Sequence, residues 1–101
     1  MARPRKLEAA EITARLDGLP GWCIEAGKLH REFRFGDFNE AFAFMTRVAM
    51  VAEQLGHHAE WFNVYSSVRV DLTTHDAGGV SELDFELAAR MNAFAGERIR
   101  S

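Results

Sequence analysis

Three of the four histidines in this chain fall where a single local fold could bring them together. His57 and His58 are adjacent in the segment EQLGHHAEWFNVY, and His75 ends the segment SVRVDLTTH. Because an unperturbed imidazole both donates and accepts protons near neutrality, a group of histidines suits a reaction that removes one proton and delivers another. Glu53, four residues before His57, could orient an imidazole or favour its charged form. These residues predict general acid–base catalysis if the surrounding elements bring the imidazoles to one cleft.

Two other interpretations of the histidines stay open at this point. A histidine pair just after a helix is also favoured by the helix dipole alone, which would make the pair structural. Three histidines and a carboxylate can hold a catalytic zinc, but adjacent histidines point to opposite sides of an extended chain. The i, i+4 spacing of a typical zinc-binding histidine pair is also absent from the sequence. We therefore predict no metal.

Other reactive motifs are weaker still. The single cysteine, Cys23, excludes an internal disulfide, and its apolar, strand-like surroundings predict a buried, unreactive thiol. The sequence contains neither a Gly-rich phosphate loop nor a Gly-x-Ser-x-Gly turn.

A long helix over residues 38–55 is the element that delivers the histidine pair. Asp37 is a suitable N-cap, Glu40 can reach back as in a capping box, and Gly56 is placed to end the helix. Its apolar residues form two neighbouring stripes, which together are wider than a helix on one sheet face needs. Either other helices flank it within the subunit or it forms a subunit interface, and we favour the interface. The stripes are Phe38, Phe42, Met45, Ala49 and Ala52, and Ala41, Phe44, Val48, Val51 and Leu55.

The remaining patterns predict two hairpins and two further helices. The segment LEAAEITARLDGLPGW begins as a helix, and WCIEAGKLHREFRF follows as a hairpin that turns at Gly27. A second hairpin turns at Ser66-Ser67 and directs Val68, Val70, Leu72 and Thr74 inward. Ser81 then caps a last helix whose buried stripe is Leu83, Leu87, Met91 and Phe94. The order α-β-β-α-β-β-α predicts an α+β fold, with a four-stranded antiparallel sheet and helices packed on one face.

Length and charge limit the possible functions. A chain of 101 residues is one domain, and we expect residues 1–6 to be a disordered basic end and residues 97–101 a polar tail. A net charge of −3 does not favour binding to nucleic acid. No stretch approaches the ~20 apolar residues of a membrane span, so we expect a cytoplasmic protein with no membrane contact.

The segments EQLGHHAEWFNVY, TTHD and SELDFELA, with the helix DFNEAFAFMTRVA, closely resemble the pterin-4a-carbinolamine dehydratases over about residues 22–95. The resemblance implies a hydro-lyase that converts a 4a-hydroxytetrahydropterin to quinonoid dihydropterin and water, recycling a tetrahydrobiopterin-type cofactor. It implies neither a metal nor an organic cofactor. One departure is Ala59, where the family usually has proline after the histidine pair; its loss could loosen the site.

The resemblance also assigns site residues. It implies that His57, His58 and His75 are catalytic, with His57 and His75 transferring protons and His58 orienting the pterin. Without the family, Asp84 is equally a first-turn helix carboxylate. Trp61 could also be a core residue rather than a wall for a flat ring. The remaining implied residues are Glu53 and Asp84 as supports of the imidazoles, Trp61 in the pocket wall, and Thr73, Thr74 and Asp76 as substrate contacts.

The family resemblance implies dimers or tetramers that form through the sheet edge and the long helix, as the second apolar stripe also suggests. The rival interpretation is a non-catalytic interaction or coactivator module on the same fold. It predicts that exposed positions on the long helix, such as Arg47, matter more than the histidines.

Overall fold

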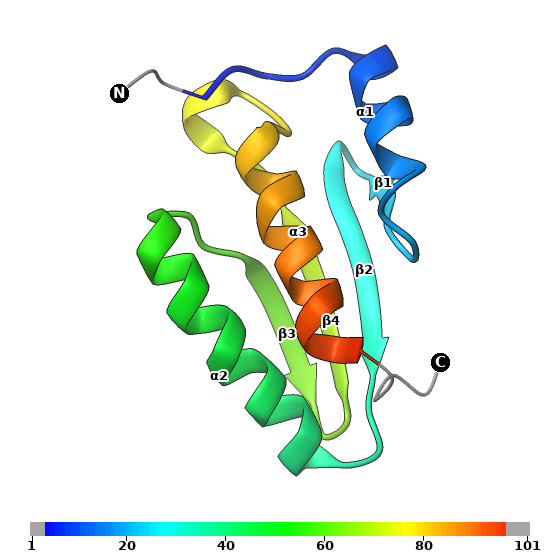
Figure 1. The fold of residues 1–101 in the computed structure, drawn as a ribbon, viewed down its shortest axis with the longest axis vertical. Coiled ribbons are helices and arrows are strands. Elements are labelled where there is room, and N and C mark those ends of the chain that lie inside the picture. The colour runs from blue at the N-terminus through cyan, green and yellow to red at the C-terminus, as the bar shows by residue number, and fades with distance from the viewer. Residues whose placement is uncertain (1–3, 97–101) are drawn as a thin grey trace.

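The computed structural model describes residues 4–96, so positions 1–3 of the expected basic end and the whole expected polar tail lie outside the described residues. In this part of the chain the order is α1 (Ala9–Leu16), β1 (Cys23–Glu25), β2 (Lys28–Arg34), α2 (Phe38–Leu55), β3 (Glu60–Val64), β4 (Ser67–Leu72), the short 3-10 helix η1 (His75–Ala77) and α3 (Glu82–Ala95). The strands form one antiparallel sheet in the order β1-β2-β4-β3. Figure 1 shows α2 and α3 side by side over one face of the sheet, with α1 beside β1. The predicted fold class is confirmed.

The caps of α2 form largely as its sequence predicts. The Asp37 side chain accepts a hydrogen bond from Glu40 N at 2.9 Å, and Glu40 Oε1 accepts one from Gly36 N at 2.7 Å, one residue earlier than a capping box requires. Gly56 ends the helix with φ 64°, a left-handed conformation that costs glycine little. The N–H of His57 then donates to Ala52 O at 3.0 Å and closes the helix end. The backbone of the first site histidine is therefore fixed by the same bonds that terminate α2.

The core lies between the sheet and the helices. The inward residues of β2 and β4 are fully buried against α2 and α3, and the rings of Phe33 and Phe44 approach to 4.7 Å between centroids. Of the stripe predicted for α3, Leu87 and Met91 are buried, whereas Leu83 and Phe94 are half-buried. The fully buried strand residues are Leu29, Phe33, Val68, Val70 and Leu72.

The two apolar stripes of α2 are covered to different extents. The stripe from Ala41 to Leu55 is buried except for its half-buried last residue. In the stripe from Phe38 to Ala52, Ala52 is buried, but Phe38 and Phe42 are exposed, Phe42 by 54%. The Phe38 and Phe42 rings lie 5.4 Å apart on the helix surface. Other helices within residues 4–96 therefore do not cover Phe38 and Phe42, and for these two side chains the alternative of flanking helices is wrong.

Two local predictions are corrected. Cys23 is exposed rather than buried, because it pairs with His30 on the sheet face that the helices leave uncovered. The second hairpin turns at Tyr65-Ser66 rather than Ser66-Ser67, since Val64 already pairs with Ser67. Tyr65 takes the positive φ of 51° that this tighter turn needs. No helix in the described residues is both long enough and apolar enough to cross a membrane.

Candidate active site

His57 is the most enclosed of the three site histidines. It follows the end of α2 directly, is only 8% exposed, and its Nε2 lies 2.5 Å from Oδ1 of Asp84 on α3. Asp84 is fully buried. A buried carboxylate needs donors for its lone pairs, and an imidazole N–H is one of them. The first turn of α3 therefore holds the first histidine by a short, buried hydrogen bond.

Further donors complete the surroundings of Asp84. Its Oδ2 accepts hydrogen bonds from Thr74 Oγ1 and from Ser81 N, both at 2.9 Å. Thr74 and Ser81 are themselves buried, and their hydroxyl oxygens lie 2.6 Å apart. Asp84 is the third residue of α3, where the helix dipole also favours a negative charge. The carboxylate is thus satisfied by three protein donors, and the segment after β4 is tied to the start of α3.

His58 lies in a different environment from its neighbour. Its Nε2 is 2.7 Å from Oε1 of Glu53, and both side chains are mainly exposed. Glu53 was expected to orient an imidazole, and the imidazole that it contacts is that of His58. The two adjacent histidines therefore have separate carboxylate partners, one buried and one exposed.

His75 is carried by the loop after β4. It opens η1, its side chain is 86% exposed, and its Nε2 lies 3.7 Å from Oε2 of Glu60 at the start of β3. The loop itself is closed at its base, because Thr74 N donates to Gly79 O at 2.9 Å and Gly78 N donates to Thr74 O at 3.0 Å. The third histidine is thus held on a short, internally bonded loop.

One cavity of about 400 Å³ brings these elements together. All three histidines line it, so the predicted convergence of the imidazoles is observed in the arrangement of α2, β4 and η1. A second cavity, of about 510 Å³, shares His58 and is lined by Glu53, Ala59 and Trp61. The residues that line the first cavity are Pro4, Gly56, His57, His58, Thr73, Thr74, His75, Asp76 and Leu83.

The sequence did not point to every residue of this site. Leu83 was assigned to the core and Ser81 only to a helix cap, yet Leu83 lines the cavity and Ser81 binds both Asp84 and Thr74. The signal available for Ser81 was its spacing from Asp84, since a capping box places the third helical residue back on the cap. No comparable pattern marks Leu83. Among residues 4–96, no three His, Cys, Asp or Glu side chains are grouped as metal ligands.

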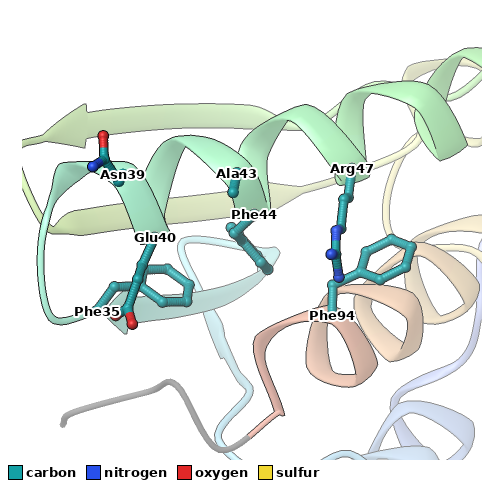
Figure 2. Close-up of a pocket in the computed structure, with 7 residues that line it drawn as sticks. All are labelled: Phe35, Asn39, Glu40, Ala43, Phe44, Arg47 and Phe94. Carbon is teal, nitrogen blue, oxygen red and sulfur yellow. The ribbon is translucent and has the colours of Figure 1, made fainter.

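Figure 2 shows another cavity, of about 300 Å³, between the first half of α2 and the end of α3. Its apolar wall includes Phe35, Phe44 and Phe94, and Arg47 points toward Phe94 across it. Its carboxylate, Glu40, already accepts the Gly36 N–H. This cavity contains none of the histidines, so the groups suited to proton transfer belong to the other end of the fold.

The chain matches the family model described as Pterin 4 alpha carbinolamine dehydratase over residues 5–94. Two similar proteins, both provisionally named as pterin-4-alpha-carbinolamine dehydratases, come from Sinorhizobium medicae and Chelativorans sp. The first is 52% identical over 96% of this chain and 94% of its own length. The second is 54% identical over 96% of this chain and all of its own.

Two solved structures share the fold. A transcriptional coactivator/pterin dehydratase from Brucella melitensis superposes with a TM-score of 0.89, at 46% identity, over 91% of this chain and the whole of that chain. A pterin dehydratase-like protein identified as a RuBisCO assembly factor in the alpha-carboxysome gives a TM-score of 0.61, at 26% identity, over 74% of this chain and 87% of that chain.

Proposed function

Because this chain belongs to the pterin-4a-carbinolamine dehydratase family and is a dehydratase of that family, we propose that its three-histidine cavity dehydrates a 4a-hydroxytetrahydropterin. The products are quinonoid dihydropterin and water, so the reaction is one step in recycling a tetrahydrobiopterin-type cofactor and a separate two-electron reduction completes the cycle. The observation that carries the proposal is the meeting of His57, His58 and His75 at one cavity. Three imidazoles with different exposure and different partners supply the proton donor and acceptor that this reaction needs.

The reaction requires two proton transfers and no change of oxidation state. A ring nitrogen of the substrate gives a proton to a base, and its electron pair forms a new double bond to carbon as the C4a–O bond breaks. The leaving hydroxyl takes a proton from an acid and departs as water. Because one proton is taken and one is given, the enzyme returns to its starting state after the acid and base exchange their protons through solvent.

We assign the transfers to His57 and His75, and the orientation of the pterin to His58. His57 is buried and held by Asp84, so its reactive nitrogen has a fixed position. His75 is exposed at the cavity rim, where it can exchange protons with water. Trp61, in the adjoining cavity that shares His58, supplies an aromatic surface for a flat ring, and Thr73 and Asp76 supply polar contacts beside His75.

The test is the stopped-flow ultraviolet decay of freshly prepared 4a-hydroxytetrahydropterin. The wild-type protein should accelerate the decay, and His57→Ala or His75→Ala should slow turnover by about 100-fold, as loss of a general acid or base does. His30→Asn is the matched control, because His30 lies on the uncovered sheet face, bound to Asp71 and Glu25. Full turnover by both folded site variants would reject the assigned roles.

We also propose that the chain forms a dimer or tetramer through the β3 edge of the sheet and the exposed stripe of α2. β3 is an edge strand of the sheet. Its residues Phe62 and Val64 are exposed on the face opposite the helices, and Phe38 and Phe42 are exposed on α2. Exposed apolar side chains beside an unpaired strand edge mark interaction surfaces. Phe42→Glu should lower the mass measured by sedimentation, whereas Gln54→Glu on another face of α2 should not; an unchanged mass for both excludes this interface.

A second candidate function uses the same surface to bind another protein. It is favoured by the exposed stripe of α2 and by the likeness to an assembly factor and to a coactivator. Under this alternative, Phe42→Glu on the exposed stripe, or Arg47→Ala on the side of α2 that faces α3, abolishes binding of the partner protein, while His75→Ala leaves binding intact. The dehydratase proposal expects the reverse order of effects on turnover.

A further inference from the structure

The buried hydroxyls of Thr74 and Ser81 belong to a hydrogen-bonded chain whose direction can be deduced. An ionised carboxylate only accepts hydrogen bonds, so the Thr74 hydroxyl donates its one hydrogen to Asp84 Oδ2 at 2.9 Å. Thr74 has then no hydrogen left for Ser81. In the 2.6 Å contact between the two hydroxyls, Ser81 is therefore the donor. Ser81 is free to donate, because its own oxygen accepts from Leu83 N at 3.2 Å.

The same argument fixes the other end of the chain at His57. Asp84 Oδ1 can only accept from Nε2, so Nε2 carries a hydrogen. The other ring nitrogen, Nδ1, has no hydrogen-bond partner among residues 4–96. Every buried side-chain nitrogen or oxygen in these residues does have a partner, so Nδ1 is not buried. Since His57 lines the three-histidine cavity, Nδ1 is the atom that remains for a substrate.

From this geometry we infer that Ser81 and Thr74 are positioning residues that act through Asp84 to hold His57 with its hydrogen on Nε2 and a free lone pair on Nδ1. This inference rests on the proposed function and deepens it, because it makes His57 the base of the reaction. Nδ1 takes the proton from the substrate nitrogen, and the resulting imidazolium is stabilised by Asp84 at its other side. The acid that protonates the leaving hydroxyl is then a different group, for which His75 is placed at the cavity rim.

Substitutions at Thr74 and Ser81 remove different numbers of bonds from this hydrogen-bonded network. Thr74→Val removes the donor to Asp84 and the acceptor of Ser81 together, whereas Ser81→Ala leaves the bond from Thr74 to Asp84 intact. Thr74→Ser keeps both bonds. We expect kcat to fall roughly 10-fold in Thr74→Val, less in Ser81→Ala, and hardly at all in Thr74→Ser. KM should change little, because the Thr74 hydroxyl is occupied by protein partners and is not offered to the substrate.

The deciding experiment is nitrogen NMR of the His57 ring in the folded, substrate-free protein, where protonated and unprotonated ring nitrogens resonate in separate ranges. With the ring neutral, wild type should show Nε2 protonated and Nδ1 unprotonated. Thr74→Val removes a donor that holds Asp84 Oδ2, so the carboxylate can turn away from Nε2 and the two neutral forms of His57 should mix. Thr74→Ser should restore the wild-type spectrum. Thr13→Val is the matched control, since it removes a hydroxyl that binds only Ala9 O on α1.

Two results would overturn the inference. One is a wild-type spectrum with the hydrogen on Nδ1. The other is a folded Thr74→Val variant whose spectrum and kcat equal those of wild type. Failure of the wild-type protein to dehydrate a 4a-hydroxytetrahydropterin would instead reject the proposed function, and the spectrum would still decide which nitrogen of His57 is free.

Discussion

Nε2 of His57 and Oδ1 of Asp84 lie 2.5 Å apart although the two residues are 27 positions apart in the chain. This contact joins the end of α2 to the first turn of α3. Asp84 is fully buried, whereas His57 keeps 8% exposure where it lines the three-histidine cavity. The contact therefore contributes both to the stability of the fold and to the geometry of the site. Variants of the residues around it can be compared in unfolding and in turnover to separate the two contributions.

Replacement of Asp84 should destabilise the protein more than replacement of an exposed carboxylate in the first turn of a helix. Asp84→Ala leaves the donors from His57, Thr74 and Ser81 without an acceptor, and we expect the free energy of unfolding to fall by about 3–5 kcal/mol. Asp84→Asn keeps the shape and one acceptor oxygen, so about 1–3 kcal/mol should be lost. Urea denaturation measures both. Asp17→Asn, at the exposed end of α1, should stay within ~0.5 kcal/mol of wild type, and equal midpoints for the Asp84 and Asp17 variants would contradict the role of the buried network.

His57 and His75 should differ in stability although both are assigned to catalysis. The His75 side chain is exposed on a loop, so His75→Ala should change the free energy of unfolding by less than ~0.5 kcal/mol. His57→Ala removes the partner of a buried carboxylate and should cost about 1–3 kcal/mol. Thermal melts in parallel with turnover give the comparison. A His75→Ala variant that unfolds earlier than His57→Ala would show that the η1 loop, rather than the Asp84 contact, organises this end of the fold.

Restoring the family's proline at position 59 should be tolerated. Ala59 lies between the histidine pair and β3, and no loop hydrogen bond within residues 4–96 uses its N–H. Proline would restrict the backbone of the unfolded chain and favour an extended His58. We expect Ala59→Pro to raise the free energy of unfolding by about 0.4–1 kcal/mol without loss of turnover. Its control is Ala26→Pro, because Ala26 has φ 52° and cannot accept proline; a loss of stability in both variants would mean that position 59 is equally incompatible with the ring.

Local signals in the sequence were enough for the framework of the site. Asp37, Gly56 and Ser81 act as helix ends through their own backbone geometry and side-chain bonds, so their roles depend on few distant residues. The alternation of Val68, Val70 and Leu72 likewise fixes which side of β4 is buried.

What the sequence left open depends on contacts between distant segments. Asp84 has the same local pattern whether it faces water or His57, and only the packing of α3 on α2 decides between them. The partner of Glu53 could not be read from spacing, because Gly56 ends the helix before either histidine. Cys23 was misjudged for a similar reason: apolar neighbours do not say which face of an edge strand the helices cover.

The Arg5–Glu11 pair should give the start of α1 a measurable pH dependence. Two hydrogen bonds from the Arg5 guanidinium, at 2.7 and 3.0 Å, and one from Glu8 N lower the pKa of Glu11 from 4.5 to about 2. Because the pKa is lower in the folded protein, the stabilisation is complete above the ordinary value of 4.5 and is lost as the pH falls toward 2.

An NMR titration of the Glu11 carboxyl measures this directly. The midpoint should lie near 2 in wild type, and Arg5→Ala should move it up toward 4.5, because the guanidinium is the largest cause of the lowered pKa. Lys6→Ala is the matched control for removing one positive charge from the same segment, and it should leave the midpoint nearly unchanged. Since the pair is exposed, added salt should also raise the midpoint. A wild-type midpoint near 4.5 would show that Arg5 does not hold Glu11 in solution.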